Sequence, residues 1–206
     1  MPRIPAAERR AALAQAALTV IARDGLAAAT TRAIVAEAGM PLASFHYAVA
    51  SRDELLRDVV ELVVTAEGTA AAEFLQTATT PREAIAKSLT GYLDHVKSDP
   101  GNEQAMFELT QYALRTPQLS DLPAEQYRSY HALAADLLRA GASLLHIEWS
   151  IPVPDLARLL VTLTDGLTLA WLADRDDAAA ARAIDHAADA VAAFARRLPA
   201  AQAVTA

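Results

Sequence analysis

The 206-residue sequence contains no cysteine, which excludes disulfide bonds and thiolate chemistry. It also lacks an uninterrupted apolar run long enough to span a bilayer, because its most apolar stretch, residues 155–174, contains Arg158 and Asp165. The first ten residues, MPRIPAAERR, are polar and basic, and no apolar signal-peptide region follows them. We therefore expect a cytoplasmic protein with no part in the membrane.

Signatures of catalysis are missing too. The chain has no glycine-rich phosphate-binding loop and no nucleophile elbow. His95 and His131 lack the spacing to other histidines or carboxylates that a zinc or iron site needs. Asp176 and Asp177 are paired carboxylates, but they fall in an expected turn, which favours a solvated pair. The sequence therefore predicts no enzyme activity, no metal and no cofactor.

Helix-forming residues, by contrast, are abundant. Apolar residues make up 53% of the chain and charged residues 21%, which suits a sizeable core. Alanine, the strongest helix former, is frequent, and apolar residues recur at helical spacing almost everywhere. The fold class is therefore predicted to be all-α, with nine helices. Their expected spans are about 6–23, 30–39, 42–49, 52–77, 81–98, 103–115, 123–145, 155–173 and 178–198.

The nine helices divide into two parts that differ in helix length and in charge. Three short helices lie in residues 1–50, and six longer ones form a body over residues 51–206. Residues 1–52 carry six arginines and three carboxylates, a charge of +3, whereas the remainder carries −10 within a total of −7. A basic head on an acidic body is typical of a protein whose head contacts a polyanion. We expect two domains, 1–50 and 51–206.

The second and third helices are separated by a tight turn. Thr30 or Thr31 can cap the first of the pair, which ends at Gly39, and Pro41 suits the first turn of the next. Two short helices joined by a glycine-containing turn are typical of a helix-turn-helix, whose second helix enters the major groove of DNA. This pattern predicts a DNA-binding head.

Several side chains of the pair can serve such a contact. The hydroxyl, imidazole and guanidinium groups that can bond phosphate belong to Thr30, Thr31, Ser44, His46, Tyr47 and Arg52. At the start of the third helix, where side chains reach base edges, lie Leu42, Ala43 and Ser44. Structural roles are the alternatives: Thr30 as a helix cap only, Tyr47 packed on the body, His46 on the surface, and Arg52 paired with Glu54 or Glu37.

The segment from Ala11 to Leu56 resembles the DNA-binding domain of the TetR family of bacterial transcriptional regulators. The matching pieces are the segment from AAL to ARDG (residues 16–25), TTRAIVAEAGM (30–40), SFHYAV (44–49) and SRDELL (51–56). By this resemblance, the contacts to DNA fall on Thr30, Arg32, Ser44, His46 with Tyr47, and Arg52.

The segment departs from the family pattern at four positions. His46 stands where tyrosine is usual and Arg52 where lysine is usual, and both keep a phosphate donor. Ala48 stands in place of a polar or aromatic residue. Val49 replaces a phenylalanine, which is expected to weaken the small core beneath the third helix.

The resemblance further implies that the fourth to seventh helices surround a ligand cavity. Candidate ligand contacts are polar or aromatic groups on otherwise buried faces, although each is equally consistent with core filling or surface exposure. They are Tyr92, Phe107, Gln111, His131, Trp149 and Trp171.

The resemblance also implies a homodimer through helices about 155–173 and 178–198. Both helices carry wide apolar faces, with Leu159, Leu163 and Trp171 on the first and an alanine stripe on the second. The alternative is that these faces form only the core of a monomer.

The predicted function is that of a ligand-responsive transcriptional regulator. Two recognition helices one turn of DNA apart would read a palindromic operator, and a small organic effector would shift the dimer to a state with lower DNA affinity. Repression released by the effector is the expected mode. The alternative is a helical small-molecule-binding adaptor without DNA binding, which predicts that loss of Arg32, Tyr47 and Arg52 leaves the function intact.

Overall fold

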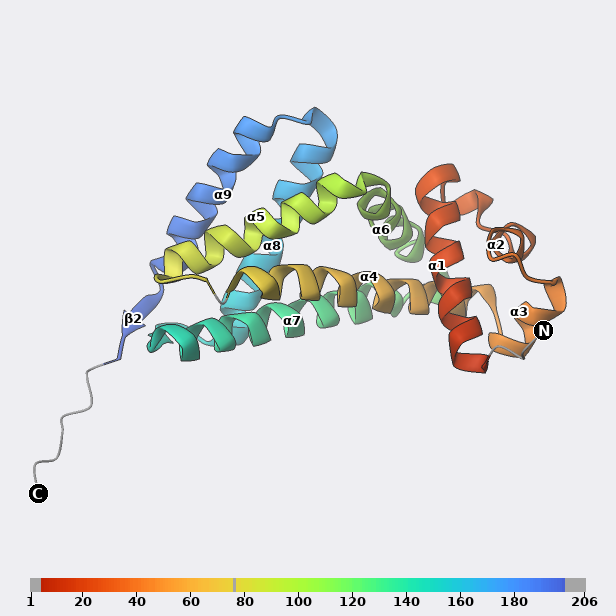
Figure 1. The fold of residues 1–206 in the computed structure, drawn as a ribbon, viewed down its shortest axis with the longest axis horizontal. Helices are drawn as coiled ribbons and strands as arrows, with labels where there is room; N and C mark the ends of the chain where they lie inside the picture. The colour runs from red at the N-terminus through yellow and green to blue at the C-terminus, as the bar shows by residue number, and fades with distance from the viewer. Residues whose placement is uncertain (1–4, 76, 199–206) are drawn as a thin grey trace, which may run out of the picture. The chain divides into compact units, whose positions relative to one another are not determined.

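The computed structural model describes residues 5–75 and 77–198 (Figure 1). Within these residues the chain forms nine α-helices, two short 3-10 helices (η) and one pair of short strands, so the all-α prediction is confirmed. The elements are α1 (Ala6–Asp24), η1 (Leu26–Ala28), α2 (Thr31–Glu37), α3 (Leu42–Ala48), α4 (Arg52–Leu75), α5 (Pro81–Ser98), α6 (Pro100–Ala113), η2 (Pro117–Leu119), α7 (Leu122–Leu145), β1 (Ile147–Trp149), α8 (Val153–Asp174), α9 (Asp177–Ala192) and β2 (Ala195–Arg197).

The chain forms two compact units. The first contains Met1–Gly68 and Asp94–Ser129, and the second contains Thr69–Leu93 and Tyr130–Ala206. Helices α4, α5 and α7 contribute residues to both units.

In the first unit, α1 packs against α2, α3 and α6 around a continuous apolar core. One apolar face of α1 is buried, with Leu13, Ala17 and Val20 each at most 2% exposed. Helix α2 contributes Ile34 and α3 contributes Phe45, both also at most 2% exposed. The three N-terminal helices therefore share one core that fixes α3 against α1.

The turn between α2 and α3 is built by local chemistry. Thr30 caps α2, because its Oγ1 accepts a hydrogen bond from the Ala33 amide at 3.2 Å. At the other end of α2, the amides of Gly39 and Met40 donate to the carbonyls of Ala36 and Val35, which is a Schellman closure. This closure requires a left-handed residue, and Gly39 supplies it with a φ of 63°. The predicted glycine turn is confirmed.

The second unit is organised around α8 and α9, which pack against each other. Arg175 in a left-handed conformation ends α8, and the side chain of Asp176 caps α9 by accepting from the Ala179 amide at 2.9 Å. The predicted turn between α8 and α9 is therefore confirmed. Helix α5 also contacts α8, because Tyr92 Oη lies 3.0 Å from the hydroxyl of the fully buried Thr168.

Several helix boundaries differ from the sequence-based expectation. Helix α6 begins at Pro100, not near residue 103, because proline suits the first helical position. Helix α9 ends at Ala192 instead of continuing to Leu198, and Ala195–Arg197 pairs antiparallel with Ile147–Trp149. Gly25 ends α1 with φ 83° and ψ 163°, an extended conformation with positive φ that favours glycine.

Candidate nucleic-acid interface

Helix α3 has one buried face and one open face. Phe45 is 2% exposed, and Val49, just after the helix, is 3% exposed, so valine occupies the core position where the family usually has phenylalanine. On the other face Tyr47 is 81% exposed and Leu42 is 43% exposed. Figure 1 places α3 next to α2 at the red-to-orange end of the chain. Such a helix, braced on one side and open on the other, has the geometry needed to enter a groove.

The other candidate DNA contacts lie around this open face. Ala43 and His46 are exposed on α3, and Ser44 is half-buried. Arg32 is exposed on α2, and Thr31 is half-buried at the first position of that helix. The fold therefore brings the candidates on α2 and α3 together on two adjacent short helices.

The capping role offered as an alternative for Thr30 is confirmed. The side chain is exposed, and its oxygen acts as the acceptor in the bond from the Ala33 amide. An accepting hydroxyl can still donate its own hydrogen, so this bond leaves the O–H able to reach a phosphate oxygen.

Arg52 makes contacts that the sequence did not predict. Its Nε donates to the carbonyl oxygen of Ala29 and its Nη2 to that of Leu26, both at 2.8 Å. The guanidinium carbon lies 5.9 Å from the ring centre of Tyr112 on α6. The guanidinium therefore fastens the start of α4 to the segment that precedes α2.

The alternative that Arg52 pairs with Glu54 or Glu37 is wrong, because other arginines occupy both carboxylates. Glu54 accepts from Arg10 Nη1 at 2.6 Å, and Glu37 accepts from Arg23 Nη1 at 2.9 Å.

Arg10 joins α1 to α4 through two carboxylates. Besides the bond to Glu54, its Nε and Nη2 donate to the two carboxylate oxygens of Asp58 at 2.7 and 2.8 Å. The second oxygen of Glu54 accepts from the Ala50 amide at 2.8 Å, and its backbone amide is capped by Ser51 Oγ at 3.0 Å. The Ala50 amide, followed by Arg10, lowers the pKa of the Glu54 carboxyl. This network holds α4 against the head without projecting negative charge from α3.

The electrostatics of the turn suit a polyanion. From Gly25 to Arg52 the sequence contains a single carboxylate, Glu37. It pairs with Arg23 at 2.9 Å, and Arg23 also pairs with Asp24 at 2.8 Å. Helix α3 itself contains no carboxylate, so its open face carries no negative charge that would repel phosphate groups.

The candidate ligand residues belong to both units. Phe107 and Gln111 belong to the first unit, and Gln111 is exposed on α6, whereas a ligand contact was expected on an otherwise buried face. The other four candidates belong to the second unit. Burial and the positive charge of Arg158 lower the pKa of the half-buried His131, while the charge of Asp165 acts in the opposite direction.

The two tryptophans have separate surroundings. Trp149 donates from its indole nitrogen to the carbonyl of Leu138 at 3.0 Å and borders a cavity of about 40 Å³ between α5, α7 and α8. Trp171 donates to Asp177 at 2.8 Å and lies on a larger groove between α8 and α9.

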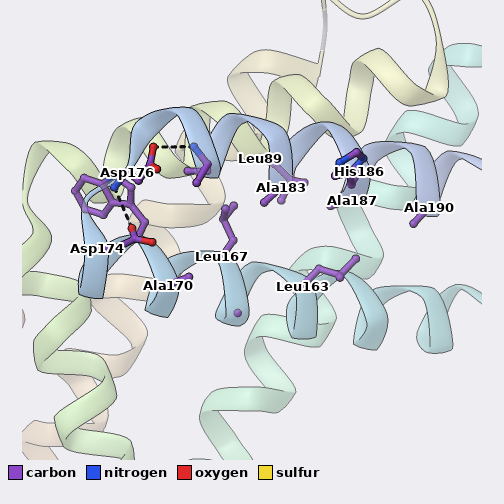
Figure 2. A pocket seen from close by; sticks show the side chains of 14 residues that line it. Leu89, Leu163, Leu167, Ala170, Asp174, Asp176, Ala183, His186, Ala187 and Ala190 are labelled. Atoms are coloured by element: carbon purple, nitrogen blue, oxygen red, sulfur yellow. Dashed lines mark hydrogen bonds between the residues drawn. The ribbon is translucent and has the colours of Figure 1, made fainter.

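The α8–α9 groove, lined by residues of those helices and by Leu89 of α5, has a volume of about 500 Å³ (Figure 2). Leu163 and Ala170 on α8 lie across it from Ala183 and Ala187 on α9, so its walls are apolar and built largely from small residues. Within residues 5–75 and 77–198, α8 is the single helix long and apolar enough to cross a membrane, although only 28% of its most apolar window is buried. Alone, one such helix is weak evidence of a membrane span, because helices that pack against protein pass the same test.

A capped helix-turn-helix with an exposed second helix on a helical body defines the class of helix-turn-helix DNA-binding proteins. Comparison with known proteins agrees. Residues 13–59 match the family model described as bacterial regulatory proteins, tetR family, and residues 81–196 match that of the BetI-type transcriptional repressor, C-terminal. The chain belongs to the TetR family of bacterial transcriptional regulators.

Individual relatives support this assignment. The chain is 33% identical over 186 residues to the HTH-type nicotine-responsive transcriptional repressor HdnoR of Paenarthrobacter nicotinovorans, covering 85% of this chain and 89% of the relative. A TetR-family transcriptional regulator from Rhodococcus sp. has a similar fold, with a TM-score of 0.76 at 22% identity over 91% of this chain and 98% of that one. The multidrug binding protein EbrR, complexed with imidazole, aligns with a TM-score of 0.61 at 27% identity over 94% and 92% of the two chains.

Proposed function

We propose that this regulator is a homodimeric repressor that binds a palindromic operator through residues 1–50 and releases it when a small organic effector binds residues 51–206. The observation that carries the proposal is the open face of α3, where Tyr47 is 81% exposed on a helix fixed by the buried Phe45. Phosphate contacts are assigned to Thr30, Thr31, Arg32, Ser44, His46 and Tyr47, and base contacts to Leu42, Ala43 and Ser44.

Dimerisation is assigned to α8 and α9. The groove between them is apolar and open along one side, and much of α8 is exposed despite its apolar composition. Exposed apolar surface of this extent favours a protein partner, and a twofold partner would set two copies of α3 on one palindrome. The chain would act in the cytoplasm, where the chromosome lies, and it has no assigned catalytic step.

The effector is assigned to the class of small organic molecules. HdnoR is described as nicotine-responsive, and EbrR as a multidrug binding protein complexed with imidazole. Both descriptions support nitrogen-containing organic compounds as the first probes. Tyr92, His131 and Trp149, all of the second unit, are the aromatic side chains proposed to contact the effector.

Release would act through contacts between α6 and the head. The Leu26 amide donates to Glu108 Oε2 at 3.0 Å, and Tyr112 of α6 lies beneath the Arg52 guanidinium. A ligand that favours a different position of α6 would disturb both contacts, and with them the segment before α2. The ligand can shift the equilibrium between the DNA-binding state and the released state only by its difference in affinity for these two states.

The test is binding to duplex DNA enriched from genomic fragments, followed by fluorescence anisotropy. We expect Arg32→Ala to weaken binding and to reduce the dependence on salt by about one counterion, and Tyr47→Phe to weaken binding without altering that dependence. Arg115→Ala is the matched control, since Arg115 is an exposed arginine of the same unit outside α2 and α3. Wild-type affinity in both head variants would support the adaptor alternative instead.

The effector step has its own test. The selected duplex is titrated with nicotine, imidazole and related amines while anisotropy is followed. Release by one of them, and loss of that release in Tyr92→Phe or His131→Ala with DNA affinity unchanged, is the expected result. If the DNA complex forms but none of a broad panel of organic compounds releases it, repression without an effector remains and the ligand-responsive part of the proposal fails.

A further inference from the structure

Helix α3 lacks the charged and amide side chains that usually form hydrogen bonds with base edges. Its seven residues, LASFHYA, include no arginine, lysine, asparagine, glutamine, aspartate or glutamate. Arginine and lysine are the usual readers of guanine, asparagine and glutamine of adenine, and the carboxylates of cytosine. A recognition helix without them cannot make the bidentate bonds that distinguish one base pair from another.

At the start of α3 the exposed side chains are apolar. Leu42 is 43% exposed, and Ala43 is also exposed. The first residues of a recognition helix are the ones that reach base edges in a helix-turn-helix. The major-groove feature that an apolar side chain can recognise is the C5-methyl group of thymine.

The polar side chains of α3 do not offer an equivalent code. Ser44 is half-buried and can bond to any base pair. The imidazole of His46 and the hydroxyl of Tyr47 are the donors assigned to phosphate. What remains at the base edges is the methyl and isobutyl surface of Ala43 and Leu42.

We propose that this regulator identifies its operator through thymine methyl groups, with Leu42 and Ala43 specifying T·A pairs in each half-site. The inference rests on the proposed binding of α3 in the major groove. It assigns the sequence specificity of that contact, which neither the fold nor the family membership fixes, to van der Waals contact in place of hydrogen bonding.

The experiment uses the full-length protein and the tightest duplex selected from a random library. Each thymidine is replaced by deoxyuridine, symmetrically in both half-sites, which removes the methyl group and leaves every hydrogen-bonding group in place. We expect about a tenfold loss of affinity at one or two positions, because each half-site loses one buried methyl contact. Replacement of thymidines flanking the selected site is the control and should leave the affinity unchanged.

Protein variants then assign the contact. At a sensitive position, Leu42→Ala or Ala43→Gly should abolish the penalty for deoxyuridine. Leu114→Ala should retain it, since Leu114 is an exposed leucine of the same unit outside α3. The deoxyuridine scan with unaltered protein decides the proposal even if a variant fails to fold.

The outcomes separate this inference from the proposed function. If the protein selects a duplex and every deoxyuridine changes its affinity less than twofold, the inference is overturned while operator binding stands. A selected half-site without T·A pairs at the sensitive positions, or a penalty that persists in both α3 variants, overturns it as well. If no duplex is preferred over random DNA, the proposed function itself has failed.

Discussion

Arg52 at the start of α4 donates through Nε to the carbonyl oxygen of Ala29, 23 residues earlier, at a distance of 2.8 Å. The residue that the family pattern places next to DNA is thus also a brace for the segment that leads into α2. A second bond, from Nη2 to Leu26, uses the fork geometry that an arginine has and a lysine lacks.

Replacing Arg52 should therefore lower stability. We expect Arg52→Ala to reduce the free energy of unfolding by about 2 kcal/mol and Arg52→Lys by about 1 kcal/mol, because hydrogen bonds from a charged donor are lost wholly or in part. Urea denaturation followed by circular dichroism at one protein concentration measures both, with Arg115→Ala expected to lie within about 0.5 kcal/mol of wild type. Unchanged stability with weakened DNA binding would assign Arg52 to phosphate instead.

We expect Gly39 to be required for its left-handed backbone conformation and not because a larger side chain would clash with a neighbour. Its φ is 63°, and a Cβ added there would meet no atom within 4 Å. Gly39→Ala should cost about 1 kcal/mol from left-handed strain alone, and Gly39→Asn clearly less, since asparagine tolerates that conformation. Thermal or urea unfolding of the two variants decides this. An asparagine variant as unstable as the alanine variant would contradict the backbone explanation.

The contribution of Glu83, at the N-terminus of α5, to the stability of the folded state should depend on pH. Glu83 accepts from Lys87, from the Thr79 amide and from the Thr79 hydroxyl, and these bonds lower its pKa from 4.5 to about 2. A carboxylate with a lowered pKa stabilises the folded state above its unfolded value and loses that contribution as pH falls through its folded value. The stability difference between wild type and Glu83→Gln should be constant above about pH 5 and should disappear toward pH 2.

Stability measured against pH for the two proteins at equal concentration tests this. The subtraction removes the contribution of all other titrating groups that the two proteins share. A difference that grows as the solution becomes more acidic would show that Glu83 is not stabilised as a carboxylate.

A charge placed in the α8–α9 groove should break the proposed dimer. Ala183 lines the groove on α9, whereas Ala181, which is also exposed, is not among its lining residues. Ala183→Glu should shift sedimentation toward the monomer and raise the dimer dissociation constant at least tenfold, because a buried carboxylate without a partner is costly. Ala181→Glu should sediment as the wild type does. Equal behaviour of the two variants would place the interface elsewhere.

The helices and the turn could be predicted from the residues alone because they depend on local chemistry, and the family could be recognised from the motif of that turn. Caps at Thr30 and Ser51 and the left-handed Gly39 act within three or four residues of chain, so they can be found without coordinates. The strands β1 and β2 could not be predicted, because a strand of three residues is too short to show the alternation of apolar and polar side chains.

Contacts between residues that lie far apart in the sequence could be identified only in the folded chain. Arg10 finds Asp58 across 48 residues, and Arg52 finds carbonyl oxygens that carry no signature in the sequence. The fold also leaves Gln111 exposed on α6 and sets Trp171 on the α8–α9 groove. Side-chain type predicts which bonds a group can make, but the packing of helices decides which partner comes within reach, and that packing depends on the whole core at once.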